Sequence, residues 1–426
     1  MFGRSANTSL DRDFNVASPT VREGAKHRIL VNDHAGHPFQ VQLSRWLARQ
    51  GHEVLHTYSS ALQTPRGALQ RQPTDSSRFS VEGLSIGREF NRYGLLSRWR
   101  QEQRLGDVLV RRAADFQPDV IISANTPLGA QRKLADYANK QHRPFIFWLQ
   151  DVLGFGMRRA LRAKLPGVGD LIGHYFEGFE RRIWRDSDHV ITITEDFVPV
   201  VERAGVDSSR VTTIHNWAPL DEMPLKERDN AWSRRHGLNG KFCFLYAGTL
   251  GLKHNPALLV ALAEAFRARE DVRIVVTSEG QGADYLQTEK NARGLDNLLL
   301  LGFQPFEQMP DVLASCDILI ALLEPDAGLF AVPSKVLTYL CAKRALLLAV
   351  PPENLAARIV SEIEAGTVVP PGDPAAFVAA AHDLMDNQNQ RRQLAANGRA
   401  YAETAFDIDT IGRRFEQIIQ STIQQK

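Results

Sequence analysis

Two segments in the second half of the chain combine small residues with a lysine, a pattern that can hold an anion. They read AGTLGLKH and VPSK, and a third loop, SEG, lies between them. Small residues let backbone N–H groups approach an anion closely, and a lysine adds a point charge. The pattern predicts a diphosphate held without a metal ion, although a solvated loop lysine at position 253 would give the same sequence. The candidate residues are Gly248, Thr249, Gly251, Lys253, Glu279, Gly280, Ser334 and Lys335.

The VPSK segment lies between two apolar runs, ILIALL and ALLLAV. Such runs predict buried strands of a parallel sheet that is covered on both faces. Ser334 is then expected to cap the helix that follows, and the dipole of that helix favours an anion at its first turn. At this point a phosphate site and an ordinary strand-to-helix loop are equally open.

A second group of polar residues follows the first predicted strand, residues 28–31, in the loop NDHAGHP. A helix is predicted from about residue 39 to residue 50. The loop contains His34 and His37, which suit acceptor binding or proton transfer. The two histidines do not predict a metal site, because no further ligands follow at a recognisable spacing.

Strand, loop and helix patterns alternate along the whole chain, which predicts α/β domains with parallel sheets. Ligands of such sheets bind beyond the carboxyl ends of the strands. Two more predicted strands, in PDVIISAN and PFIFWLQD, lead to Asn125 and Asp151. We therefore consider Asp151 and His37 as catalytic candidates and place Asn125 and His34 on the acceptor side.

The length of 426 residues predicts two domains, because a single core rarely organises so long a chain. The segment 217–235 has two prolines, many charges and no periodicity, which is typical of a linker. The predicted boundaries are a disordered leader at 1–27, an N-terminal domain at 28–218, a linker at 219–236, a C-terminal domain at 237–405 and a final helix at 406–426 that could pack back on the N-terminal domain.

The composition excludes several classes of protein. A net charge of +2 gives no global field that would favour nucleic acid. Three cysteines lie in apolar segments without a CxxC pattern, which fits thiols in a reducing compartment. The chain has no apolar run of about 18 residues, and its first 26 residues have no apolar core, so we expect neither a membrane span nor a signal peptide. These features predict a cytoplasmic protein.

Two basic stretches have an amphipathic pattern. Residues 87–116 interleave arginines with Tyr93 and Trp99, and RRALRAKL follows further on. A helix of this kind suits a membrane surface with anionic head groups. An ordinary amphipathic helix with solvated arginines is the alternative. A longer helix is predicted at 170–185, with Ile172, Tyr175 or Phe176, Phe179 and Ile183 at helical spacing.

Several segments resemble the family 4 retaining glycosyltransferases of GT-B fold. They are YAGTLGLKHNPALL, SEG, LGFQPFEQMPDVLASCDILIALL and VPSKVLTYLCA in the second half, with EDF and VTTIHNWAP in the first. Within the family, NDHAGHPFQVQLSRWLARQGHEV is most similar to transferases that add amino-deoxy sugars such as N-acetylfucosamine in O-antigen or capsular polysaccharide assembly. The resemblance implies an α/β protein with two doubly wound Rossmann-like domains that face a central cleft.

The resemblance also implies roles for individual residues. Lys253 would contact the donor diphosphate, Gly36 would line the acceptor and phosphate loop, and Ser334 and Lys335 would lie at the donor site. The implied reaction moves a sugar from a nucleoside diphosphate donor, with a UDP-sugar favoured, to a polyprenyl-diphosphate-linked or oligosaccharide acceptor with retention of configuration. It implies no metal or other cofactor, and a protein peripheral on the cytoplasmic face of the inner membrane.

This chain departs from the family pattern at one motif. Many members carry Glu-x7-Glu, and alignment on SKVLTYL puts Thr338 at the second position, which contacts the ribose, and Phe330 at the first. Two other functions therefore stay open beside sugar transfer. One is a nucleotide-sugar 2-epimerase, which needs no acceptor, and the other is a catalytically silent subunit that binds a partner transferase.

Overall fold

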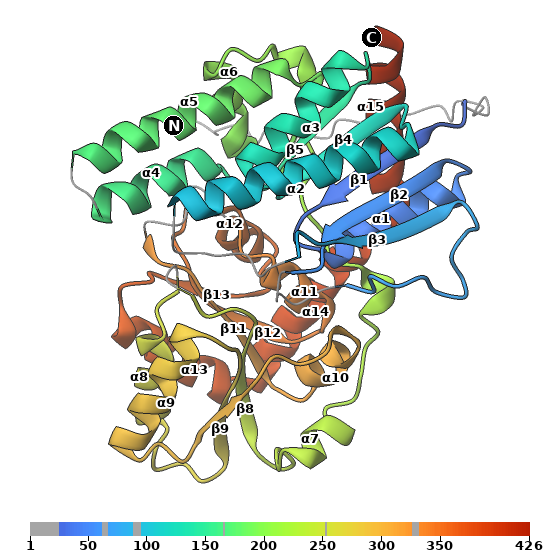
Figure 1. Cartoon of the computed structure of the whole chain (residues 1–426). Helices are drawn as coiled ribbons and strands as arrows, with labels where there is room; N and C mark the ends of the chain where they lie inside the picture. The colour runs from blue at the N-terminus through green and yellow to red at the C-terminus, as the bar shows by residue number, and fades with distance from the viewer. Residues whose placement is uncertain (1–24, 62–66, 88–94, 165–166, 252–253, 326–331) are drawn as a thin grey trace, which may run out of the picture.

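The computed structural model describes residues 25–61, 67–87, 95–164, 167–251, 254–325 and 332–426. These residues form two α/β domains, each built around a parallel sheet with helices on both faces (Figure 1). The apolar runs noted in the sequence are the central strands of the two sheets, and they are buried because helices cover them from both sides. None of the described helices combines the length and apolar character needed to cross a bilayer.

The N-terminal sheet has seven parallel strands in the order β3-β2-β1-β4-β5-β6-β7. Its centre is fixed by the pairing of Leu30 in β1 with Leu55 in β2 and with Ile121 in β4. The strands are β1 (Arg28–Asp33), β2 (Glu53–Ser59), β3 (Phe79–Leu84), β4 (Val120–Ala124), β5 (Phe145–Leu149), β6 (His189–Thr192) and β7 (Val211–Thr213). The helices are α1 (Pro38–Arg49), α2 (Leu95–Phe116), α3 (Leu128–Lys140), α4 (Leu153–Lys164), α5 (Val168–Asp186) and α6 (Val198–Arg203).

The edge strand β3 was not predicted from the sequence. It reads FSVEGL, and within it only Phe79 and Leu84 are buried. An edge strand has a neighbour on one side alone, so it needs less apolar surface than a central strand, and its pattern gives a weak signal.

The C-terminal sheet has six parallel strands in the order β10-β9-β8-β11-β12-β13. Its strands are β8 (Phe242–Ala247), β9 (Val272–Thr277), β10 (Leu298–Leu301), β11 (Ile318–Leu322), β12 (Ala345–Ala349) and β13 (Gly366–Val369). Its helices are α7 (Ala231–Arg235), α8 (Ala257–Ala265), α9 (Gln281–Arg293), α10 (Met309–Ala314), α11 (Lys335–Cys341), α12 (Leu355–Glu362), α13 (Pro374–Asp386) and α14 (Gln388–Ala405).

Part of the predicted linker is helical. Asn230 caps α7, and its side chain and that of Ser233 form a capping box. Trp232 of this helix is buried, and its Nε1–H donates to Gln304 Oε1 at 2.9 Å. A five-residue helix is too short to show periodicity, so its residues have the pattern of an irregular segment.

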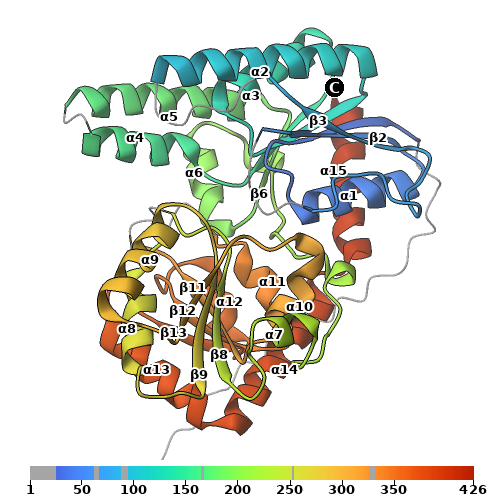
Figure 2. The ribbon, with the colours of Figure 1, turned by 60° about the horizontal axis from the view of Figure 1, so that its bottom comes forward.

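The C-terminal helix α15 (Ile408–Gln425) lies against the N-terminal domain, behind its first strands in Figure 1. The ring of Phe415 lies 4.7 Å from that of Trp148, measured between centroids. Trp46 Nε1–H donates to Asp409 at 2.7 Å, and His52 lies 3.0 Å from Glu416. The chain therefore returns to its first domain, and the two domains lie one above the other in Figure 2.

Candidate functional site

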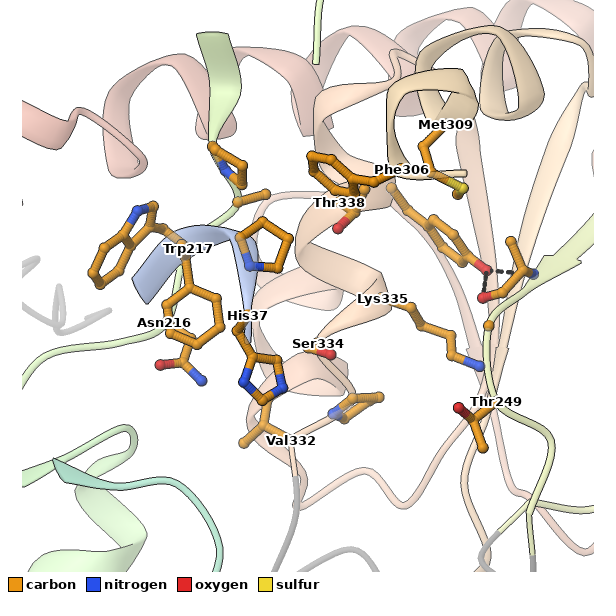
Figure 3. Close-up of a pocket in the computed structure, with 18 of the residues that line it drawn as sticks. His37, Asn216, Trp217, Thr249, Phe306, Met309, Val332, Ser334, Lys335 and Thr338 are labelled. Atoms are coloured by element: carbon orange, nitrogen blue, oxygen red, sulfur yellow. Dashed lines mark hydrogen bonds between the residues drawn. The ribbon is translucent and has the colours of Figure 1, made fainter. Parts of the chain in front are cut away.

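A cavity of about 340 Å³ lies between the two domains, at the carboxyl ends of both sheets. This is the position where parallel α/β sheets bind ligands. The N-terminal domain contributes His37, Asn125, Gln150, Asp151, Asn216 and Trp217 to its lining, and the C-terminal domain contributes Gly248, Thr249, His254, Thr277, Phe303, Phe306, Ser334, Lys335 and Thr338. Figure 3 shows His37 on one side of the cavity and Lys335 and Thr249 on the other.

On the N-terminal side, Asp33 positions His37. Asp33 is the last residue of β1 and is fully buried, and His37 is the N-cap residue of α1. The Asp33 carboxylate accepts hydrogen bonds from the backbone N–H groups of Ala35, at 3.1 Å, and of His37. His37 Nδ1 lies 3.4 Å from Asp33 Oδ1, and Asn125 Nδ2 lies 3.2 Å from the same ring nitrogen. The loop is therefore folded around the carboxylate, with the imidazole at the cavity.

The charged forms of Asp33 and His37 stabilise each other. Burial by itself lowers the pKa of His37, but the carboxylates of Asp33 and Asp151 outweigh it and hold the pKa above its usual value. Burial by itself raises the pKa of Asp33, and the charge and hydrogen bonds of His37 outweigh it in the opposite direction. The carboxylate thus favours the protonated form of His37, and the imidazole favours the ionised form of Asp33.

Two neighbours complete the surroundings of Asp33. The Gln40 side-chain amide lies 2.9 and 3.0 Å from the two carboxylate oxygens, to which it donates in the orientation that satisfies its polar atoms. His56 is the second neighbour of Asp33, and burial lowers the pKa of His56 to about 4. His56 is therefore neutral near pH 7, so it does not compete with His37 as a cation.

The loops that follow β5 and β7 are joined at the cavity wall. Gln150 and Asn216 exchange two amide hydrogen bonds, at 3.1 and 2.6 Å. The exchange fixes the loop in which Asp151 follows Gln150. Trp217 Nε1–H donates to Gln42 of α1 at 2.7 Å, so the same wall is tied to the helix that begins beside His37.

On the C-terminal side, two tyrosines fix the turn that follows β8. The Tyr339 hydroxyl accepts from the backbone N–H of Ala247 at 2.9 Å and lies 3.1 Å from its carbonyl oxygen. The Tyr246 hydroxyl donates to the carbonyl of Thr249 at 2.8 Å. Gly248 lies in this turn with φ of 118°, a backbone conformation that residues other than glycine rarely adopt. We call residues 247–249 the β8 turn.

Lys335 places a cation beside this turn. Its Nζ lies 3.5 Å from the centroid of the Tyr246 ring, a cation–π geometry. A Cβ added at Gly248 would lie 3.6 Å from the same Nζ. The ammonium group and the β8 turn therefore face one region of the cavity, which suits an anionic group of a ligand.

Ser334 does not cap its helix as predicted. It occupies the N-cap position of α11, but its backbone is helical, with φ of −56° and ψ of −25°, and its side chain makes no capping hydrogen bond. A capping side chain needs an extended backbone at this position to reach the next N–H groups. Ser334 is exposed at the cavity instead.

The cavity lining leaves out several predicted site residues. Glu279 accepts from the backbone N–H of Phe303 at 3.1 Å and so supports the wall from behind. The carbonyl of Gly36 accepts from Gly67, and the backbone N–H of His34 donates to Ala124 of β4. Gly280 caps α9, and Gly251 donates to His254 at 3.0 Å. Lys253, Phe330 and Asp326 lie outside the described residues.

Two residues with clear structural roles were not predicted as site residues. Asp33 was missed, although an acid at the end of a buried strand with a histidine four residues later is a usable signal. Gly282 is the other, because a Cβ there would lie 2.3 Å from the carbonyl oxygen of Leu250. Its lack of a side chain lets α9 approach the loop after β8. In the described part of the chain, no group of three or more His, Cys, Asp or Glu residues could hold a metal ion.

The Asp-Ser-Asp sequence at 186–188 has structural partners. Asp186 pairs with Arg132 at 2.6 Å, and Asp188 accepts from the backbone of Phe145 and from Lys426. These contacts hold the end of α5 and the start of β6 in place, so the segment has a structural role.

Comparison with known families agrees with this architecture. A family model described as a glycosyl transferase 4-like domain matches residues 37–217, and one described as glycosyl transferases group 1 matches residues 229–401. Each of the two domains therefore matches a glycosyltransferase family model. The cavity lies between the two matched regions, so each of them contributes one wall.

Two curated relatives are similar over part of their length. The putative colanic acid biosynthesis glycosyl transferase WcaI of Escherichia coli is 25% identical over 175 residues, which are 40% of this chain and 42% of WcaI. The probable glycosyltransferase WbjE of Pseudomonas aeruginosa is 22% identical over 196 residues, 46% of this chain and 49% of WbjE. The chain thus matches less than half of the length of either relative.

Solved structures share the fold at low identity. Alr3699/HepE of Anabaena, in complex with UDP-glucose, superposes with a TM-score of 0.67 at 16% identity, over 93% of this chain and all of that one. A putative UDP-N-acetylglucosamine 2-epimerase of Listeria monocytogenes gives a TM-score of 0.60 at 12% identity, over 94% and 98% of the chains. The fold therefore does not separate a transferase from an epimerase.

Proposed function

We propose that this protein transfers a sugar from a nucleoside diphosphate donor to a lipid-linked or polysaccharide-precursor acceptor, with retention of configuration at the anomeric carbon. The observation that carries the proposal is a cavity between two glycosyltransferase-family domains, with a lysine beside the β8 turn on one wall and, on the other, a histidine whose pKa nearby carboxylates raise. No metal or other cofactor takes part in the proposed reaction.

The donor diphosphate is proposed to bind Lys335 and the β8 turn. The ammonium group and the backbone N–H groups of small residues would stabilise the charge that develops on the leaving diphosphate, which is an electrostatic role. Thr249, Ser334 and Thr338 face the same region and offer hydroxyl groups to the donor. Gly251 and Lys253 are proposed to extend this site, by resemblance to the family. A UDP-sugar is the favoured donor, and the UDP-glucose complex of HepE supports that choice.

His37 and Asp151 are proposed to act on the acceptor side. An imidazolium held by Asp33 would donate a hydrogen bond to an oxygen of the bound sugar or acceptor. Asp151 approaches His37 closely enough to raise its pKa, and it would orient a hydroxyl group of the acceptor. Closure of the two domains around the substrates would exclude water and limit hydrolysis of the donor.

The printed descriptions of two similar proteins support a proposal for the acceptor class and the location. WcaI is named for colanic acid biosynthesis, and another structural neighbour, WaaG, is described as involved in lipopolysaccharide biosynthesis. We propose an acceptor carried on a polyprenyl diphosphate, an amino-deoxy sugar as the transferred group, and a cytoplasmic protein peripheral on the inner membrane. The exposed Arg100 and Arg104 on α2 agree with a membrane surface nearby.

The test is a transfer assay with the purified protein, UDP-sugars and a polyprenyl-diphosphate-linked saccharide. We expect donor consumption that requires the acceptor, continues in EDTA and gives a product whose anomeric configuration equals that of the donor by NMR. A new sugar formed from the donor alone would identify a 2-epimerase and contradict the proposal. Donor binding without turnover, restored by an added partner transferase, would identify a silent subunit.

A further inference from the structure

Three exposed apolar side chains form a stripe on α5, a helix outside the cavity. The exposed fractions are 62% for Val168, 74% for Leu171 and 61% for Tyr175. Residues three and seven positions apart lie on one face of a helix, so the three side chains line up along it. Among the described residues, the other large apolar side chains that are exposed are Leu225, at 46%, and Tyr285, at 38%.

The helix that carries this apolar stripe is held rigidly. Three glycines bring α4 and α5 together, because added Cβ atoms at Gly154, Gly169 and Gly173 would lie within 2.8 Å of the opposite helix. Glu180 of α5 accepts from the first two backbone N–H groups of α4, at 3.0 and 2.8 Å. Burial raises the pKa of Glu180 to about 8. The close contact uses one side of α5 and leaves the stripe on another.

The surroundings of the apolar stripe are basic. The exposed charged side chains described on α4 and α5 are Arg159, Arg162, Arg181, Arg182, Arg185 and Asp186. Asp186 is paired with Arg132 at 2.6 Å, and the other acidic residues of the two helices are buried or half-buried. Arg182 follows Tyr175 by seven residues and continues the same face. An apolar strip bordered by arginines is complementary to a bilayer with anionic head groups.

The position of helices α4 and α5 also suits a membrane contact. In Figures 1 and 2 the far ends of α4 and α5 extend beyond the rest of the molecule. The helix α4 begins two residues after Asp151, which lines the cavity. A helix of 12 residues is about 18 Å long, so the stripe lies within reach of an acceptor whose lipid stays in the bilayer.

We propose that the apolar stripe of Val168, Leu171 and Tyr175 and the arginines beside it dock this protein on an anionic phospholipid bilayer. The inference locates the membrane contact and to that extent rests on the proposed function. It moves the main contact away from α2, where Trp99 is half-buried and packs on Phe176 and Phe179 of α5.

The test is sedimentation of the full-length protein with vesicles, without donor or acceptor. We expect binding to vesicles of phosphatidylglycerol and phosphatidylethanolamine, and weaker binding to phosphatidylcholine alone. The double variant Leu171→Ser/Tyr175→Ser should bind the anionic vesicles at least about tenfold more weakly. The variant Arg162→Gln/Arg182→Gln should lose about fivefold per arginine at low salt. The matched control Leu225→Ser/Tyr285→Ser should bind like the unmodified protein.

Several results would overturn the inference. Unchanged binding of the Leu171→Ser/Tyr175→Ser variant would do so, as would loss of binding only in Arg100→Gln/Arg104→Gln, which would place the contact on α2. If Leu171→Ser/Tyr175→Ser converts a dimer to a monomer and leaves vesicle binding unchanged, the stripe is a contact between two copies of the chain. UDP binding in solution separates the two proposals, because stripe variants should keep it. If the unmodified protein binds vesicles but does not bind UDP, only the proposed function is refuted.

Discussion

Replacing Asp33 with Asn should reveal how the buried carboxylate controls His37. The variant keeps the size of the side chain but removes the charge that faces the imidazole 3.4 Å away. It also places an amide where two backbone N–H groups donate. Removal of one partner from a buried ion pair destabilises a protein by about 3–5 kcal/mol. For a domain of this size that corresponds to a fall in melting temperature of roughly 6–20 °C.

The pH dependence gives the sharper signature. The pKa of His37 is raised above 6.5, so its contribution to stability is complete below that value and is lost as the pH rises through the raised pKa. The pKa of Asp33 is lowered below 3.8, so its contribution is present above that value and is lost as the pH falls through the lowered pKa. The Asp33–His37 pair therefore stabilises the fold most between pH 3.8 and pH 6.5. Asp33→Asn should lose this extra stability.

The pH dependence of kcat/KM should also report the pKa of His37. If the imidazolium of His37 contacts the substrate, kcat/KM falls as the pH rises through the pKa of His37. In Asp33→Asn the pKa of His37 falls, so the alkaline limb of kcat/KM should move to lower pH. Asp75→Asn is the control, since the Asp75 side chain is 3% exposed and pairs with Arg45 at 2.8 Å. This control should lose stability and keep the limb in place. Equal limbs for all three proteins would refute the role assigned to Asp33.

Two glycines in different helices provide further predictions. A Cβ at Gly412 of α15 would lie 2.4 Å from the ring of Trp46, so Gly412→Ala should destabilise the protein by about 1–3 kcal/mol through overpacking, measured by urea denaturation. At Gly178 of α5 nothing lies within 4 Å of an added Cβ, so Gly178→Ala should instead stabilise by about 0.5–1 kcal/mol. Equal effects of the two changes would contradict the described contact of α15 with α1.

Periodicity and composition predicted much of the fold. Continuous apolar runs identified the central strands, and these strands fix where their loops meet. The loops of His37, Asn125 and Asp151 therefore face those of Gly248, Ser334 and Lys335 across one cavity, although the sequence shows no contact between them. What escaped prediction depends on close packing. The role of Asp33 comes from burial under its own loop, and that of Gly282 from the carbonyl of Leu250 nearby.

Two differences at helices have a local cause. Ser334 has the residue type of a cap, but the helical backbone at 334 prevents the capping bond. In α5, helical spacing allowed either Tyr175 or Phe176 on the buried side. The ring of Phe176 packs against Trp99, whereas Tyr175 is 61% exposed. Spacing identifies the faces of a helix, but only the neighbouring elements decide which face is covered.

Nucleotide binding to the Lys335 side of the cavity tests the central claim most directly. The measurement is a thermal-shift screen with UDP, GDP, ADP and dTDP. A ligand at about 100 times its dissociation constant adds roughly 2.7 kcal/mol to the free energy of unfolding. A charge-assisted hydrogen bond contributes about 1.5–3 kcal/mol, so Lys335→Ala should weaken binding about ten- to 150-fold. Lys140→Ala, at an exposed position on α3, is the control. Stabilisation by UDP that requires Lys335 is the predicted result, and no shift with any nucleotide, or equal shifts in all three proteins, would contradict the account.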